Sequence, residues 1–175
     1  MKKWKVALGL TLVGLALVAA GCKGKEKAKP KEVSVAARAE AAQNFSEAEF
    51  ATQIRDHARA EGLLAHAVEL DPDVPNYWLQ LGASRKKQGN VEGARKAYEH
   101  TRELLHQLYE QDKKSVAPLF AEMEICVLLG KPNDAKRLFD QALKEHPDDP
   151  EVKNFVNNKT LDAMLVAPSL KEMAL

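Results

Sequence analysis

The sequence predicts an all-α fold. Only 6% of its 175 residues are aromatic and alanine is abundant, which suits closely packed helices better than a sheet. A spacing that places one large side chain between small ones on a helical face occurs three times along the chain. Proline ends the helix after two of these copies, at Pro72 and Pro147. These observations together favour a row of helices that approach each other through small residues.

Residues 1–21 combine a basic start with a short apolar run. Lys2, Lys3 and Lys5 precede an uncharged stretch at residues 6–21. As a helix this stretch would span about 24 Å, less than the roughly 30 Å of a membrane's hydrocarbon core. A cleaved signal peptide is therefore favoured over an uncleaved amino-terminal membrane anchor, although both would tether the chain to a membrane.

The apolar run ends in Ala19-Ala20-Gly21-Cys22. This resembles the lipobox of bacterial lipoproteins, in which small residues precede an invariant cysteine. Ala19 departs from the usual larger aliphatic residue but is a tolerated variant. The resemblance implies cleavage after Gly21 and lipid, including palmitate, on Cys22. Lys23 resembles the outer-membrane sorting pattern, so we expect a lipid-anchored envelope protein that faces the periplasm if the cell has two membranes.

A lysine-rich linker is predicted at residues 22–36. Residues 23–32 hold five lysines and two glutamates, so they cannot bury enough apolar surface to fold. Two interpretations stay open for this linker. Its lysines either lie against acidic lipid head groups or only keep the spacer soluble.

Three copies of a helical pattern follow the linker. The second copy lies 34 residues after the first, and the third lies a further 41 residues on. The copies are Ala60, Leu64, Ala67 and Pro72; then Ala94, Tyr98, Thr101 and His106; then Ala135, Phe139, Ala142 and Pro147. The extra seven residues equal about two helical turns, so one long helix at about residues 91–112 can absorb them without turning its apolar face.

The second copy carries the fullest motif: Trp78, Leu81, Gly82, Gly89, Ala94 and Tyr98. These residues strongly resemble the signature of the tetratricopeptide repeat. The third copy fills the same frame with Leu119, Met123, Cys126, Gly130, Ala135 and Phe139. The first copy is the weakest, because Arg55 stands at the usual turn glycine. An unrelated antiparallel helical bundle is the alternative.

The resemblance implies a right-handed α-solenoid of about three helical hairpins over residues 37–149. The hairpins are expected at about 41–74, 75–108 and 116–149. After them, residues 150–175 are predicted to form a capping helix and an apolar tail, because a terminal repeat must cover its last apolar face. The tail either folds back onto the helices or stays exposed as an apolar surface that tends to associate with other molecules.

Catalytic, metal-binding and nucleic-acid-binding motifs are not predicted. The five histidines show no metal-ligand spacing and are expected to be solvated, while Cys126 is expected to be a small buried hydrophobic residue. The net charge is +1, and three lysines lie in the leader, so the body is mildly acidic rather than basic. We therefore expect no enzyme, no cofactor and no nucleic-acid partner.

In tetratricopeptide proteins the first helix of each hairpin lines a concave groove for a partner's extended segment or helix. The equivalent positions of this sequence are Phe45, Glu49, Asn76, Leu79, Ala83, Lys86, Lys87, Phe120, Glu124 and Val127. Leu79 and Phe120 occupy equivalent positions and are expected to be exposed in an apolar stripe. The alternative is that the capping helix or the tail fills this groove.

The resemblance favours a membrane-anchored scaffold or assembly factor that binds a protein in the bacterial envelope. A different class is a self-associating structural lipoprotein, for which the apolar tail is the only hint. A third is a non-catalytic accessory domain of an envelope enzyme complex.

Overall fold

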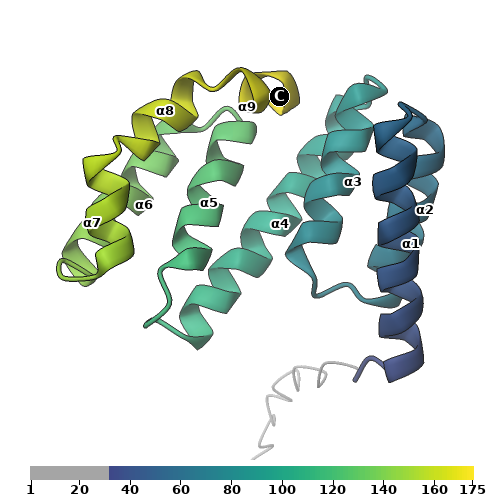
Figure 1. Cartoon of the computed structure of the whole chain (residues 1–175), viewed down its shortest axis with the longest axis horizontal. Coiled ribbons are helices and arrows are strands. Elements are labelled where there is room, and N and C mark those ends of the chain that lie inside the picture. The colour runs from purple at the N-terminus through teal and green to yellow at the C-terminus, as the bar shows by residue number, and fades with distance from the viewer. Residues whose placement is uncertain (1–31) are drawn as a thin grey trace, which may run out of the picture. The chain divides into compact units, whose positions relative to one another are not determined.

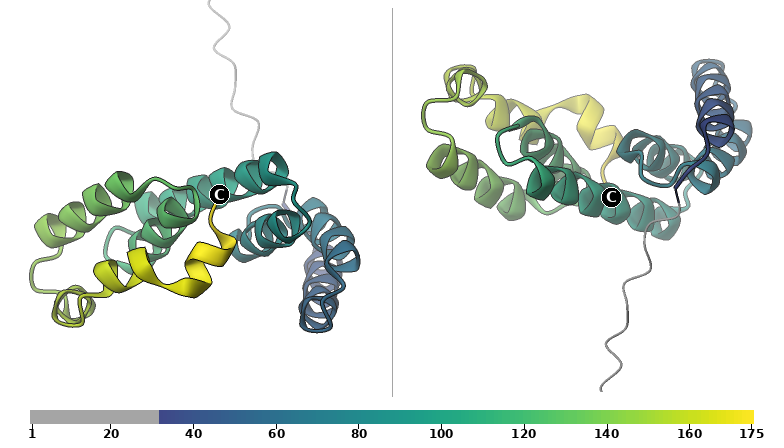
Figure 2. Two further views of the ribbon diagram at one scale, coloured as in Figure 1. Left: turned by 90° about the horizontal axis from the view of Figure 1, so that it is seen from above. Right: turned by 90° about the horizontal axis from the view of Figure 1, so that it is seen from below.

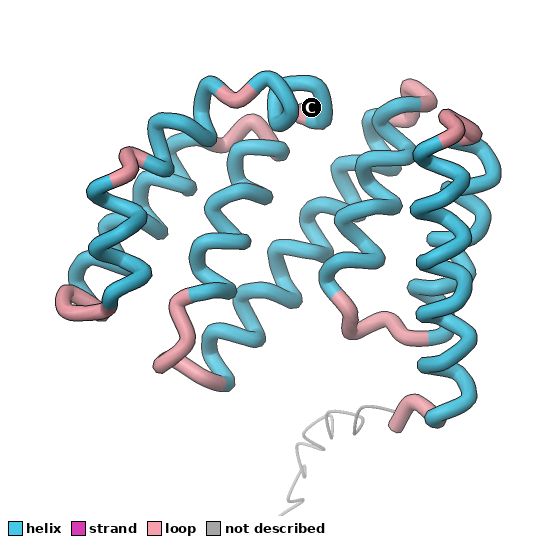
Figure 3. Tube along the Cα trace, viewed as in Figure 1, coloured by secondary structure: helices cyan, strands magenta, loops and turns pink. Residues whose placement is uncertain are grey.

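The computed structural model describes residues 32–175, which form helices joined by short turns (Figure 3). Within this part of the chain there are nine helices and no strand, so the all-α prediction is confirmed. The helices are α1 (Val35–Gln53), α2 (His57–Leu70), α3 (Pro75–Lys87), α4 (Val91–Gln111), α5 (Ala117–Leu128), α6 (Pro132–Glu145), α7 (Pro150–Asn157), α8 (Thr160–Val166) and α9 (Pro168–Met173). The predicted signal peptide, Cys22 and most of the predicted linker lie outside the described residues.

The first six helices pair as three hairpins (Figure 1). The two helices of each pair, α1 with α2, α3 with α4 and α5 with α6, contact each other along their lengths. Successive hairpins are joined by contacts of α2 with α3 and of α4 with α5. Each hairpin therefore covers one side of the next, as the predicted repeat requires.

Each hairpin turns through one residue in the left-handed region. Arg55, Gly89 and Gly130 stand at equivalent places with φ of 61°, 80° and 69°. After each of them, the next amide donates a hydrogen bond back to the last turn of the first helix: Asp56 to Ala51 O (2.8 Å), Asn90 to Arg85 O (2.9 Å) and Lys131 to Cys126 O (2.8 Å). The first hairpin thus makes the same turn as the others, with arginine in the place of glycine.

Small residues are buried where helices approach. Ala60, Ala94 and Ala135, the first residues of the three copies, are all fully buried. A side chain at Gly82 would collide with Tyr98, because a Cβ there would lie 2.4 Å from Tyr98 Cε1. The predicted close packing through small residues is therefore observed.

The second helix of the middle hairpin is long, as expected, because α4 runs from Val91 to Gln111 and so makes more than five helical turns. Its buried stripe includes Thr101, Leu104 and Leu105. The Thr101 hydroxyl donates to Ala97 O at 2.9 Å, which satisfies this polar group in the core. The stripe ends on Tyr109, whereas Leu108 is 41% exposed.

The three last helices fold back along the repeats (Figure 2). Val152 and Phe155 of α7 are buried against the third hairpin, so the predicted capping helix is present. Helix α8 contacts α5 and α6, and α9 contacts both α3 and α5. Of the two alternatives for the apolar tail, the structure shows the one in which the tail folds back.

Candidate functional site

The predicted partner-binding residues lie on α1, α3 and α5, the first helices of the three hairpins. We call the face formed by these helices the groove face. It divides into an open part, between α1 and α3, and a covered part, where α9 lies against α3 and α5.

The open part contains a cleft of about 200 Å³. Its lining residues are Phe45, Ala48, Glu49, Thr52 and Gln53 of α1, Leu64 of α2 and Gln80 of α3. The ring of Phe45 packs 4.9 Å from the ring of Tyr77, so the cleft has an apolar wall, while Glu49 is exposed at its rim. The structure thus brings the predicted residues Phe45 and Glu49 together. Asn76 is exposed on α3 but does not line this cleft.

In the covered part, two predicted residues are not exposed as expected. Leu79 is half-buried in an apolar cluster that also contains Leu170, Met173 and Leu175. Phe120 is half-buried because its ring stacks on Phe155, with centroids 4.4 Å apart and an interplanar angle of 16°. The expectation of exposure was wrong, because the chain's own last helices cover these apolar side chains.

Polar contacts also hold α9 on the groove face. The Tyr98 hydroxyl donates to Met173 O at 3.1 Å, and the Leu175 amide donates to Leu128 O at 2.9 Å. Lys87, another predicted groove residue, forms an ion pair with Glu172. The hydrogen bond from Lys87 and its charge lower the pKa of Glu172. Because this pair is exposed, it adds little to the stability of the docked segment.

The other predicted groove residues are half-buried. Val127 packs against both apolar clusters of the second and third hairpins. Burial raises the pKa of Glu124. Ala83 and Lys86 of α3 are also half-buried. The groove face is therefore apolar at its centre with charged side chains beside it, which suits protein recognition.

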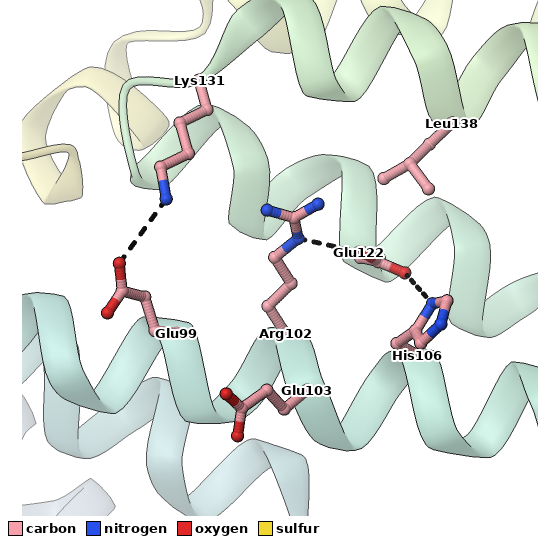
Figure 4. A pocket seen from close by; sticks show the side chains of 7 residues that line it. All are labelled: Glu99, Arg102, Glu103, His106, Glu122, Lys131 and Leu138. Carbon is pink, nitrogen blue, oxygen red and sulfur yellow. Dashed lines mark hydrogen bonds and ion pairs between the residues drawn. The ribbon is translucent and has the colours of Figure 1, made fainter.

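A second cleft, of about 480 Å³, lies between α4, α5 and α6 and was not predicted from the sequence (Figure 4). It is lined by Glu99, Arg102, Glu103, His106, Glu122, Lys131 and Leu138. The signal that could have located it is Glu122, which with Glu124 is one of two acids within the apolar run of α5.

Arg102 connects three helices across this second cleft. Its Nε donates to Glu122 Oε1 at 3.0 Å and its Nη1 donates to Asp134 Oδ2 at 3.2 Å. Glu122 is only 2% exposed, and among residues 32–175 its Oε2 has no hydrogen-bond partner, although His106 Nδ1 lies 3.5 Å away. We interpret this cluster as a structural ion-pair network that aligns α4 with α5 and α6.

Within the described residues, Cys126 is a free cysteine and is buried. Burial, the main cause, raises the pKa of the Cys126 thiol to about 11, so the thiol stays protonated and is a poor nucleophile at neutral pH. Residues 32–175 contain no group of three or more His, Cys, Asp or Glu side chains that could hold a metal ion.

Three histidines are less solvated than expected: His57 is half-buried, and His100 and His146 each lie against an aromatic ring. His100 meets Trp78 edge-on with ring centroids 4.3 Å apart, and His146 Nε2 lies 2.9 Å from the Tyr109 hydroxyl. Both side chains are half-buried. We assign them a packing role.

Residues 96–158 match the family model of the tetratricopeptide repeat. No curated protein matches the chain. Among solved structures, the type III secretion chaperone SycD of Yersinia enterocolitica, in complex with a peptide of the translocator YopD, is 22% identical, with a TM-score of 0.46 and coverage of 81% of this chain and 99% of that one. SycD in an alternative dimer is 23% identical, with a TM-score of 0.47 and coverage of 81% and 98%. PcrH in complex with the chaperone binding region of PopD is 21% identical, with a TM-score of 0.43 and coverage of 75% and 92%.

Proposed function

We propose that this chain, which carries tetratricopeptide repeats, is a protein-binding scaffold held at a bacterial envelope membrane by lipid on Cys22. In this proposal the groove face binds a segment of a partner protein. The two parts of the proposal, binding and tethering, rest on different observations and are tested separately.

The observation that carries the binding proposal is the open cleft between α1 and α3. It has an apolar wall at Phe45 and polar groups at its rim, among them Glu49, Gln53 and Gln80. An apolar centre with a polar rim provides burial for affinity and hydrogen bonds for orientation. The cleft also shares its face with the place where α9 is docked, so this face accepts a helical segment elsewhere along its length.

The tether is supported by the sequence alone. The basic start, the short apolar run and the motif that ends at Cys22 favour export and acylation. Among the helices at residues 32–175, none is both long and apolar enough to span a membrane. Lipid on Cys22, followed by the lysine-rich residues 23–32, would place the repeats beside the membrane surface.

Binding is tested by placing positive charge at the rim of the open cleft. We expect Glu49→Arg with Gln53→Arg to reduce capture of the native partner from cells at least fivefold, measured by quantitative mass spectrometry. Glu92→Arg with Gln107→Arg is the matched control, because these exposed residues of α4 receive the same chemical change away from the cleft. Loss of capture in the control pair alone would place the interface elsewhere.

Tethering is tested with Cys22→Ser. We expect wild-type protein to incorporate a palmitate label and to sediment with membranes, and the variant to take up no label and to remain as an uncleaved precursor. Wild-type protein that takes up no label and stays soluble would contradict the tether without affecting the binding proposal.

A further inference from the structure

Residues 168–175, which we call the tail segment, present an apolar edge to the groove face. Leu170 is 7% exposed, and Met173 and Leu175 are half-buried in the same cluster. The wall of this cluster is formed by Tyr98 of α4 and by Ile125 and Leu128 of α5. The tail segment therefore binds as a short amphipathic helix that ends at Met173, followed by an extended end, with apolar residues at the first, fourth and sixth positions counted from Leu170.

The groove face holds the backbone of the tail segment at two points. Three of the last four carbonyls of α5 accept amides from the turn that follows it, and the fourth, Leu128 O, accepts the Leu175 amide. The Tyr98 hydroxyl donates to Met173 O. Both bonds are made to main-chain atoms of the tail segment, so another peptide in the same position could form them whatever its sequence.

One contact of the tail segment is made by a side chain and therefore depends on the amino-acid sequence of the docked segment. Glu172 pairs with Lys87 at the end of α3, and the hydrogen bond and charge of Lys87, together with the charge of Arg55, lower the pKa of Glu172. This edge of the groove therefore favours an acidic side chain two residues after the first apolar one.

Docking of the tail segment is weakly favoured. A six-residue helix is too short to be stable alone, so docking must order it. The burial of three apolar side chains is opposed by the loss of conformational entropy of eight residues, and the Lys87–Glu172 pair is exposed. A competing segment of similar chemistry could therefore replace the tail segment.

From these contacts we infer that the ends of α3 and α5 form the binding place for a partner's short amphipathic helix with the pattern of Leu170, Glu172, Met173 and Leu175. The tail segment is an intramolecular competitor for that place. This inference rests on the proposed function, since it names the kind of protein segment that the groove face binds.

The test uses a fluorescent peptide with the sequence of residues 166–175 and the full chain in lipid nanodiscs, with empty nanodiscs as the blank. Leu170→Asp in the protein releases the tail segment and leaves the groove intact. We expect this variant to bind the peptide at least tenfold more tightly than wild type, and a peptide that itself carries Leu170→Asp to bind neither protein. A folded variant with no gain in affinity overturns the inference.

A charge exchange keeps the test valid if Leu170→Asp unfolds the protein. Lys87→Glu changes an exposed residue and should bind a peptide carrying Glu172→Lys more tightly than the natural peptide, whereas wild type should prefer the natural one. The same preference in both proteins overturns the inference.

Three further outcomes have defined meanings. A wild-type dimer in light scattering that dissociates when the peptide is added overturns the intramolecular competitor and makes a second copy of this chain the occupant. A partner that is captured through the open cleft, with peptide affinity unchanged in Leu170→Asp, overturns this inference and leaves the proposed function standing. Tight peptide binding with no partner captured overturns the proposed function instead.

Discussion

Tyr98 occupies the space beside Gly82 that any larger residue at position 82 would need. A Cβ at Gly82 would lie 2.4 Å from Tyr98 Cε1, and both residues are buried. We expect Gly82→Ala to lower the free energy of unfolding by roughly 1 to 3 kcal/mol through overpacking. In a protein that already carries Tyr98→Leu, Gly82→Ala should cost less than it does in the wild type. Urea unfolding of the wild type, the two single variants and the double variant measures both costs. Simple additivity of the two changes would contradict this contact.

Arg55 adopts a backbone conformation that favours glycine. Its φ is 61°, close to the 80° and 69° of Gly89 and Gly130 at equivalent turns. We expect Arg55→Gly to raise the free energy of unfolding by about 1 kcal/mol, because it removes the steric cost of a Cβ in this region. Arg55→Ala is the control, since it removes the charge but keeps the Cβ. An equal gain from both variants would mean that charge, not backbone strain, limits stability.

Tyr98 makes stability dependent on pH in the alkaline range. Burial raises its pKa to about 12, above the ordinary value near 10, so the folded state holds this proton more tightly than the unfolded state. Its contribution is complete below pH 10 and is lost as the pH rises from 10 to 12. Unfolding curves should show this fall, and it should be smaller in Tyr98→Phe. An identical fall in the variant would mean that other groups cause it.

Arg102 compensates a buried negative charge. Glu122 is 2% exposed and accepts a 3.0 Å hydrogen bond from Arg102 Nε. Because the arginine is partly exposed, we expect Arg102→Met to cost about 2 to 3 kcal/mol, somewhat less than for a fully buried pair. Adding Glu122→Met should restore most of that loss, since no unpaired charge then remains. A double variant less stable than Arg102→Met would show that Glu122 has another essential partner.

The repeat frame could be predicted from the sequence because its determinants are local. Gly89 and Gly130 indicate turns, and Gly82 with Tyr98 indicates a close approach of two helices. In each case the residue types and their spacing in the sequence predict the local packing. The cleft residues Phe45 and Glu49 were found the same way, through equivalent positions on the first helix. The turn at Arg55 was the exception, because the other contacts of the hairpin impose the conformation that glycine would favour.

The sequence left open whether the capping helix or the tail fills the groove, because this depends on contacts between residues far apart in the sequence. The pattern of Leu170, Met173 and Leu175 fits a buried helix as well as an exposed one, and nothing near them indicates Tyr98 or Leu128 as partners. The burial of Glu122 was missed for the same reason, since its partner Arg102 lies on another helix.

The central claim is that the groove face binds a protein partner, and photo-crosslinking in cells tests it most directly. A photoreactive amino acid replaces Glu49 at the rim of the open cleft, and in a separate strain it replaces Gln107, which is exposed on α4. We predict that one protein is cross-linked in high yield from position 49 and not from position 107. Cross-links to that protein from position 107, with none from position 49, would contradict the claim.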